Sequence, residues 1–250
     1  MTPFDKAFAL DVMYPAAVAA YTVMTPDVTP VSPPGFVVVG AIQADSPTTL
    51  QFDQAFIANR MLRESRLFGL VLYSQTTATV LVTYRGTQTS WEWVSDLEAS
   101  PVPNPGGPGD VHAGFELVYE LCARSVFGLI TQCGLGVGHV LITGHSLGAA
   151  VAVLAALDLA NKGRRPVRCY TWEGPRVGTD AFQTAFDAAI PDCWRIVNAG
   201  DIVPKLPAPP LYRHVGQEQL VHGPHSFPHS FFSPHVAHAL TSAYQGVVAL

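Results

Sequence analysis

The sequence predicts a single α/β domain with a mostly parallel central sheet and helices on both of its faces. From residue 138 onward, short apolar runs alternate with helical segments, and this alternation joins parallel strands through helical crossovers. Composition agrees, because 48% of the residues are hydrophobic and only 13% are charged, which indicates a large buried core. A chain of 250 residues can form one such domain, and nothing in it forces a division. We therefore expect residues 1–250 to be one domain.

The first half of the chain predicts helices and an antiparallel hairpin. Residues 5–21 have apolar side chains at helical spacing, interrupted by Pro15, and predict a helix or a pair of helices on the outside of the sheet. A polar turn at residues 75–78 separates two strand-like runs and predicts a hairpin. The expected strands are residues 35–42, 68–74 and 79–84, and a further helix is expected at about 50–62.

The second half predicts the parallel part of the sheet. A Pro- and Gly-rich stretch, residues 101–109, breaks regular structure before a helix that opens at 111–115 and runs to about Gln132. Residues 200–234 are expected to form a loop. The alternating elements are strand 138–143, helix 147–161, strand 167–172, helix 179–189, strand 193–198 and a terminal helix at 236–249.

The segment 141–150 has the pattern of a strand, a sharp elbow and a helix. Ser146 stands at the elbow, where side chains two residues before and after it would collide, and both of these positions are glycines, Gly144 and Gly148. The helix that follows consists almost entirely of Ala, Val and Leu, so it can lie close to a sheet with its N-terminal N–H groups aimed at the serine. This context favours a nucleophile over an idle serine in a tight turn.

A serine hydroxyl needs a histidine to accept its proton and an acid to orient that histidine. In this kind of fold the order along the chain is Ser, acid, His. Asp201 directly follows a predicted strand and is the preferred acid, whereas Asp180, Asp187 and Asp192 lie in or beside a helix. The alternative for Asp201 is a loop carboxylate that caps local N–H groups.

The base is expected near the start of the last helix. His238 begins an amphipathic segment there and is preferred, and His235 would face the same way one helical turn earlier. The remaining downstream histidines, each of which can instead be structural, are His214, His222, His225 and His229.

The oxyanion of a tetrahedral intermediate needs two or more donors. The Leu147 N–H is expected to be one. The second is expected from the turn Gly86-Thr87, which follows a strong early strand, and the Thr87 hydroxyl can add to it.

Other classes of function are disfavoured by the composition. A formal charge of −5, with no cluster of Lys and Arg, argues against nucleic acid as a partner. Four cysteines lie far apart without Cys-x-x-Cys spacing, so no metal site is expected, and free thiols are favoured although a Cys122–Cys133 bridge stays open. No cofactor is expected either.

No transmembrane segment and no export signal are expected. The apolar stretch 137–160 is interrupted by Gly-rich turn chemistry and is better explained as a strand and a helix. The N-terminus lacks a basic region followed by a long apolar region, which favours a location in the cytoplasm but leaves secretion by another route open. The sequence also leaves the oligomeric state open.

The chain resembles the class 3 lipases of the α/β-hydrolase superfamily, over about residues 70–248. The resemblance rests on several blocks in the right order: Tyr84-Arg85-Gly86-Thr87, Trp93-x-x-Asp96-Leu97, Val111-His112-Ala113-Gly114-Phe115, Thr143-Gly144-His145-Ser146-Leu147-Gly148, Gly174-Pro175-Arg176-Val177-Gly178, and Asn198-x-x-Asp201-Ile202-Val203-Pro204. It implies Ser146 as nucleophile, Asp201 as acid, and Thr87 with Leu147 as oxyanion hole. It also implies structural roles for His112, His145 and His214.

The chain departs from the family at two places. Where the family usually has Phe-Gly-x-Pro, this chain has Trp172-Glu173-Gly174-Pro175, which places a carboxylate near a strand end and makes Glu173 a rival for the role of the acid or for a pocket role. The tyrosine of the terminal motif usually stands closer to the histidine than Tyr244 stands to His238.

The sequence therefore favours a cofactor-free lipase acting on acylglycerols through a Ser146–Asp201–His238 triad. Its partners would be a lipid or small ester substrate and, transiently, a lipid interface. Trp91, Trp93, Val94 and Leu97 are expected to form an amphipathic lid, with a core-facing helix as the alternative. Two other functions stay open: a short-chain or aromatic-acid esterase on the same triad, and a lipid-binding protein without activity.

Overall fold

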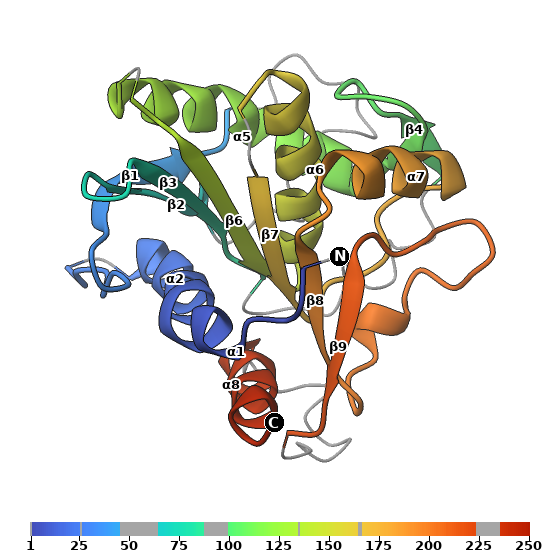
Figure 1. Cartoon of the computed structure of the whole chain (residues 1–250). Helices are drawn as coiled ribbons and strands as arrows, with labels where there is room; N and C mark the ends of the chain where they lie inside the picture. Colours follow the sequence, from blue (N-terminus) through green and yellow to red (C-terminus); the bar gives the residue numbers. More distant parts are fainter. Residues whose placement is uncertain are drawn as a thin grey trace.

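The computed structural model describes residues 2–25, 27–45, 65–87, 100–134, 136–164, 167–223 and 236–250, with side chains in the last range from residue 240 onward. A seven-stranded sheet in the order β1-β2-β3-β6-β7-β8-β9 divides these residues into two layers of helices (Figure 1). Its strands are β1 (Val37–Gln43), β2 (Leu67–Ser74), β3 (Thr79–Tyr84), β6 (His139–His145), β7 (Val167–Trp172), β8 (Cys193–Asn198) and β9 (Gln217–Val221).

The sheet is mostly parallel, as the sequence predicts. The neighbours from β3 to β9 pair in parallel, and only β1–β2 and β2–β3 pair antiparallel. The β2–β3 pair is the expected hairpin. Parallel strands end at one edge, and this edge carries the segments that follow β3, β6, β7 and β8.

Helices cover both faces of the sheet. On one face lie α5 (Ala113–Gln132), α6 (Leu147–Asn161) and α7 (Asp180–Ala189). On the other lie α8 (Val236–Val248) and a continuous N-terminal helical segment. That segment consists of α1 (Lys6–Phe8), the π-helical η1 (Ala9–Met13), α2 (Tyr14–Ala19) and the 3₁₀ segment η2 (Ala20–Met24), so the helix continues past Pro15, which occupies the first turn of α2.

The two faces of the sheet are packed by different side chains. Successive residues of a strand point to opposite faces, and in β3 Val80 and Val82 face the core under α5 and α6, whereas Leu81 faces the core under the N-terminal helices. The Ala-rich α6 approaches closely over these valines. Larger side chains, including Tyr170 and Trp172 of β7, fill the opposite core.

The structure corrects two expectations about loops. Residues 200–234 are not all loop, because β9 pairs in parallel with β8. The strand was missed because it is short and polar, with exposed or half-exposed side chains at four of its five positions. Likewise, residues 101–109 are not wholly irregular, because β4 (Pro101–Pro103) pairs with β5 (Asp110–His112).

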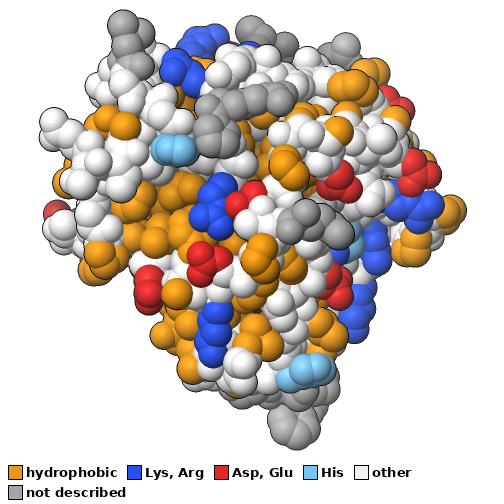
Figure 2. Space-filling view, viewed as in Figure 1, with side chains coloured by type: hydrophobic (Ala, Val, Ile, Leu, Met, Phe, Trp, Pro, Cys, Tyr) orange, Lys and Arg blue, Asp and Glu red, His pale blue; other side chains and the backbone are white. Residues whose placement is uncertain are grey.

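Two long apolar stretches of the sequence form elements that pack in the core. The predicted strand and helix within 137–160 are confirmed as β6 and α6. Among the described residues, the helical segment Lys6–Met24 is long and apolar enough to cross a membrane, yet its buried residues, such as Met13 and Ala16, pack on the sheet. On the face drawn in Figure 2, hydrophobic side chains reach the surface in patches, with charged side chains scattered between them.

Candidate active site

Ser146 lies at a strained elbow between β6 and α6. Its backbone has φ 57° and ψ −124°, a conformation that a non-glycine residue rarely adopts. A Cβ at Gly144 would lie 2.2 Å from the Gly148 carbonyl oxygen, and a Cβ at Gly148 would lie 2.4 Å from the carbonyl oxygens of Tyr84 and Arg85. The two glycines are therefore required for the close approach that the sequence predicts.

The elbow places Ser146 at the N-cap of α6, with 7% of its surface exposed. The first turn of α6 is fixed to it, since the Ala149 N–H donates to the Ser146 carbonyl oxygen over 3.0 Å. Leu147 is the first residue of the helix. The positive end of the helix dipole is therefore directed to the serine, where it favours negative charge.

The turn after β3 lies against the elbow. A Cβ at Gly86 would lie 3.0 Å from the Ser146 Cβ and 3.0 Å from the His145 carbonyl oxygen, so the backbone of Gly86-Thr87 passes directly beside the serine. The buried Arg85 guanidinium holds this turn, because it donates to the carbonyl oxygens of Gly86 and Ser65 over 2.8 and 2.9 Å. Thr87 is 7% exposed.

Tyr21 joins the turn to the elbow and was missed by the sequence reasoning. Its hydroxyl accepts a hydrogen bond from the Gly86 N–H over 2.9 Å and lies 2.7 Å from Nδ1 of His145. The hydroxyl therefore connects the backbone of the turn to the imidazole at the elbow. Burial lowers the pKa of His145 to about 3, so this imidazole stays neutral.

Asp201 follows β8 at the same edge of the sheet. Its N–H donates to the Asn198 carbonyl oxygen over 2.9 Å, and its Oδ1 accepts from the Val203 N–H over 2.9 Å at the start of the short helix η4 (Val203–Lys205). Burial raises the pKa of its carboxyl, while hydrogen bonds from Glu173 and from the N–H groups of Val203 and Ile202, and the charge of Lys205, act in the opposite direction.

Glu173 lies next to Asp201 and directly after β7. Its side chain is 1% exposed, its Oε1 accepts from the Asn198 N–H over 2.9 Å, and its Oε2 is buried with no donor among the described residues. Burial first, and then the negative charge of the adjacent Asp201 carboxyl and hydrogen bonding with it, raise the pKa of Glu173 well above the ordinary value. The two candidate acids of the sequence therefore form one pair.

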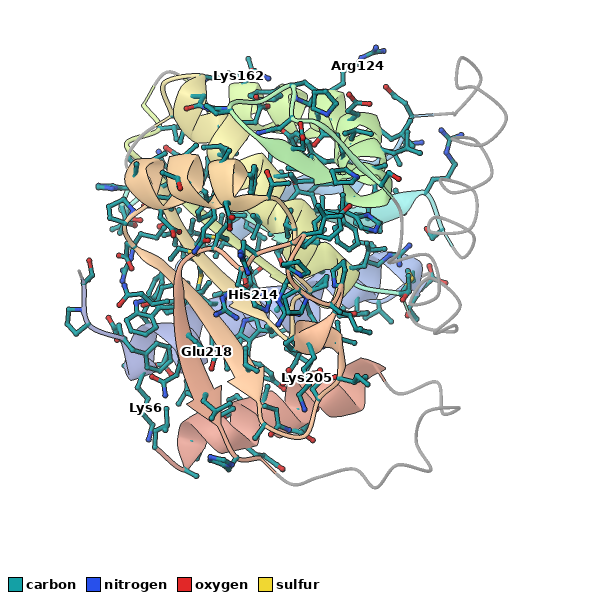
Figure 3. The ribbon with its side chains drawn as sticks, turned by 90° about the vertical axis from the view of Figure 1, so that its right-hand side faces the viewer. Lys6, Arg124, Lys162, Lys205, His214 and Glu218 are labelled. Atoms are coloured by element: carbon teal, nitrogen blue, oxygen red, sulfur yellow. The ribbon has the colours of Figure 1, made fainter. Side chains whose placement is uncertain are left out.

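Two other histidines of the sequence motifs make local hydrogen bonds. His112 caps α5, where its Nδ1 accepts from the Gly114 N–H over 3.1 Å, and its ring stacks on Phe115. His214 Nε2 donates to the Pro204 carbonyl oxygen over 2.7 Å, and burial lowers the pKa of His214 to about 3. This bond joins the segment before β9 to η4, and Figure 3 labels His214 and Lys205 on this side of the molecule, together with Glu218 of β9.

The expected base and lid are placed only in part. His238 belongs to the first turn of α8, and its side chain lies outside the described residues, as do His235, the further helix at about 50–62 and the lid residues Trp91, Trp93, Val94 and Leu97. The middle of α8 packs closely on the segment that follows β9, since a Cβ at Gly223 would lie 1.8 Å from the Ser242 carbonyl oxygen. The position of α8 therefore depends on this contact.

The described residues give two findings on metal ligands and thiols. No group of three or more His, Cys, Asp or Glu residues that could hold a metal ion is found among these residues. Cys122 and Cys133 are both free, as are Cys169 and Cys193. The open question of a Cys122–Cys133 bridge is thereby answered for this structure.

Comparisons with known proteins agree on one family. The family model described as Lipase (class 3) matches residues 81–210, just over half of the chain. Thr87, Ser146, Glu173 and Asp201 lie within the match, and α8 lies beyond it. Phospholipase A1-II 3 of Oryza sativa subsp. japonica is 35% identical over 175 residues, which cover 57% of this chain and 42% of that protein. The chain thus spans about two-fifths of the length of this curated relative.

Solved lipase structures share the fold. The lipase of Rhizopus microsporus var. chinensis is 27% identical, with a TM-score of 0.63, over 83% of this chain and 72% of that one. The triacylglyceride lipase of Rhizomucor miehei is 25% identical, with a TM-score of 0.63, over 83% and 78% of the two chains. The expected α/β-hydrolase fold is therefore confirmed.

Proposed function

This chain belongs to the class 3 lipase family, and on that premise we propose that it is a serine carboxylic-ester hydrolase that cleaves acylglycerols. The observation that carries the proposal is the contact between the strained Ser146 elbow and the Gly86-Thr87 turn. The proposed nucleophile lies there beside the two proposed sources of N–H donors, a combination that hydrolysis of an ester by an acyl-enzyme route requires.

The proposed mechanism uses side chains, backbone N–H groups and water. The Ser146 hydroxyl attacks the ester carbonyl while His238 accepts its proton and Asp201 orients the imidazole. The Leu147 N–H, together with the Thr87 N–H and hydroxyl, stabilises the negative charge on the carbonyl oxygen. His238 then protonates the leaving alcohol, and water, activated by the same histidine, releases the acid from Ser146.

Covalent labelling tests the nucleophile. A fluorophosphonate is expected to label the wild-type protein at Ser146, as mapped by mass spectrometry, and S146A is expected to lose both labelling and at least about 10⁴-fold of kcat. A folded wild-type protein that neither labels nor hydrolyses any ester would favour the lipid-binding function without activity.

The identity of the base is tested by two single variants. H238A is expected to lower kcat about as much as S146A, because the two residues act as one unit, whereas H235A is expected to keep most of kcat. The rates of ester hydrolysis and of fluorophosphonate labelling measure both. A loss in H235A with activity retained in H238A would reassign the base.

The substrate class is tested with a series of esters. Trp91, Trp93, Val94 and Leu97 are proposed as a lid that covers the site in water and contacts lipid at an interface. We expect a higher rate on emulsified triacylglycerol than on p-nitrophenyl butyrate or palmitate, with a rise in rate where the substrate forms an emulsion. A phospholipid belongs in the series, since the rice relative is named a phospholipase A1. Equal rates on dissolved and emulsified esters would favour the esterase and exclude the lid.

A further inference from the structure

Glu173 occupies a backbone conformation that favours glycine. Its φ is 52°, and among the described non-glycine residues it shares a positive φ with Asp27, Ala78 and Ser146. A non-glycine residue in this region is strained, because its Cβ crowds the backbone. The family that the sequence resembles usually has glycine here, so this chain carries a strained residue where an unstrained one fits the fold.

The side chain of Glu173 is held between β8 and the turn that follows it. Its own N–H donates to the Ile196 carbonyl oxygen over 3.0 Å, and its Oε1 accepts from the Asn198 N–H over 2.9 Å. Its Oε2 is buried and receives no hydrogen bond from a described residue, and the Asp201 carboxyl, whose charge acts on Glu173, lies beside it. The carboxyl thus lies between the end of β8 and the proposed acid.

A hydrogen bond between two carboxyl groups requires that one of them keeps its proton. Asp201 has the better support for a negative charge, because it accepts from the N–H groups of Val203 and Ile202 and faces the Lys205 ammonium. Glu173 is almost fully buried and accepts from one backbone N–H. The proton therefore belongs on Glu173, and the elevated pKa of that residue agrees with this assignment.

We propose that Glu173 is a positioning residue, which as a neutral carboxylic acid donates a hydrogen bond to the Asp201 carboxylate and fixes the orientation in which that carboxylate meets the base. The inference rests on the proposed role of Asp201 as the triad acid. Asp201 is then held from two sides, by the Val203 N–H in its own turn and by the Glu173 hydroxyl from the neighbouring strand. Orientation of the acid affects kcat, since the acid acts on the histidine and not on substrate binding.

Two substitutions of Glu173 test whether its hydrogen-bonding atoms are needed for activity: E173Q keeps such atoms, and E173G removes the side chain. E173Q keeps an acceptor for the Asn198 N–H and supplies an amide N–H to Asp201, so it is expected to keep kcat within about threefold. E173G removes the carboxyl, and since glycine suits the positive φ, the variant is expected to fold. We expect it to lose about tenfold or more of kcat on a dissolved ester, with KM unchanged.

A double-mutant cycle shows whether the effect passes through Asp201. In a D201A background, the further change E173G is expected to slow fluorophosphonate labelling of Ser146 by less than about twofold, because the group that Glu173 positions is already absent. Equal factors in both backgrounds would show a general structural role and overturn the proposal. It would also be overturned by full activity in E173G, or by activity that survives D201A and is lost in E173Q, which would make Glu173 the triad acid.

Infrared spectroscopy measures the protonation state of Glu173 independently of catalysis. The infrared difference spectrum of wild type minus E173Q at neutral pH is expected to contain the carbonyl stretch of a protonated carboxylic acid. Its absence would show that Glu173 is ionised and overturn the proposal even if the enzyme is active. Conversely, a wild-type protein without ester hydrolysis or labelling would refute the proposed function, while the infrared band would still report the state of the pair.

Discussion

The Tyr21 hydroxyl hydrogen-bonds both the turn and the elbow that together form the proposed oxyanion hole. It bridges the Gly86 N–H and His145 Nδ1. Both partners are buried, so neither can replace the bond with one to bulk water. The position of the oxyanion donors relative to Ser146 therefore depends on a residue from the N-terminal helical segment.

Replacement of this hydroxyl is expected to cost both activity and stability. Y21F leaves the Gly86 N–H and His145 Nδ1 without their shared partner, and we expect a fall of about tenfold in kcat and about 1–3 kcal/mol in the free energy of unfolding. Ester hydrolysis and urea unfolding measure the two effects. The matched control is Y170F, which removes a buried tyrosine's hydroxyl that accepts the Asp5 N–H over 3.4 Å, away from the site. Equal kcat in Y21F and Y170F would contradict the role of Tyr21.

Among the elements, those predicted from the sequence are the ones with strong local signals. The β2–β3 hairpin, the elbow at Ser146 and the alternation that leads to β8 depend on apolar periodicity and on glycines at fixed spacing. The edge strand β9 has no such signal, because only one of its five residues is buried.

Parts of the site that depend on tertiary contact could not be predicted. Ser146, Thr87 and Asp201 are predicted as site residues because each follows a strand, in an order that the fold fixes. The contact of Tyr21 with His145 spans 124 residues of sequence, and no local pattern encodes it. The sequence marked Glu173 as unusual, but its pairing with Asp201 arises only because β7 and β8 are neighbours.

The contact between β9 and α8 is expected to control the position of the proposed base. In G223A the new Cβ would meet the Ser242 carbonyl oxygen, so α8 must shift, and with it His238; we expect a fall of about tenfold in kcat. The control is G128A in α5, where nothing lies within 4 Å of the new Cβ and a gain of about 0.5–1 kcal/mol in stability is expected. Kinetics and thermal unfolding distinguish the two. Wild-type kcat in a folded G223A would show that this contact does not position the base.

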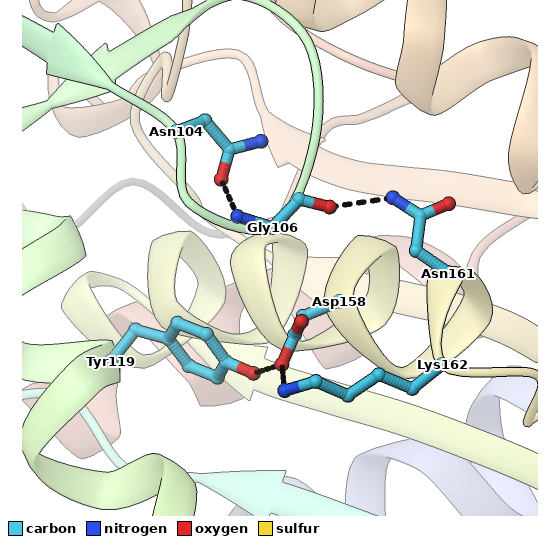
Figure 4. A network of polar contacts seen from close by, with 6 residues as sticks. All are labelled: Asn104, Gly106, Tyr119, Asp158, Asn161 and Lys162. Atoms are coloured by element: carbon cyan, nitrogen blue, oxygen red, sulfur yellow. Dashed lines mark hydrogen bonds and ion pairs between the residues drawn. The ribbon is translucent and has the colours of Figure 1, made fainter.

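At the scale of the whole molecule, a buried acidic cluster joins α5 and α6 on the face opposite the N-terminal helices. Figure 4 shows Asp158 of α6 accepting from the Tyr119 hydroxyl of α5 over 2.5 Å and from Lys162 Nζ over 2.7 Å. Glu116, one turn before Tyr119, is buried near the same carboxylate, and its Oε2 has no hydrogen-bond partner among the described residues. Burial first, and then the charges of Glu120 and Asp158, raise the pKa of Glu116 to about 8.

This raised pKa makes the stability of the fold depend on pH. Between its ordinary value of 4.5 and about 8, Glu116 is protonated in the folded protein and ionised in the unfolded chain. The unfolded state then binds fewer protons, so the contribution of Glu116 to the free energy of unfolding falls as pH rises through this window, by at most about 1.4 kcal/mol per pH unit, and is constant above it. E116Q removes the ionisation, and its stability relative to wild type is expected to rise between pH 5 and 8 by about this slope. Urea unfolding of both proteins across this range measures the difference, and parallel pH profiles would show that Glu116 is ionised in the fold.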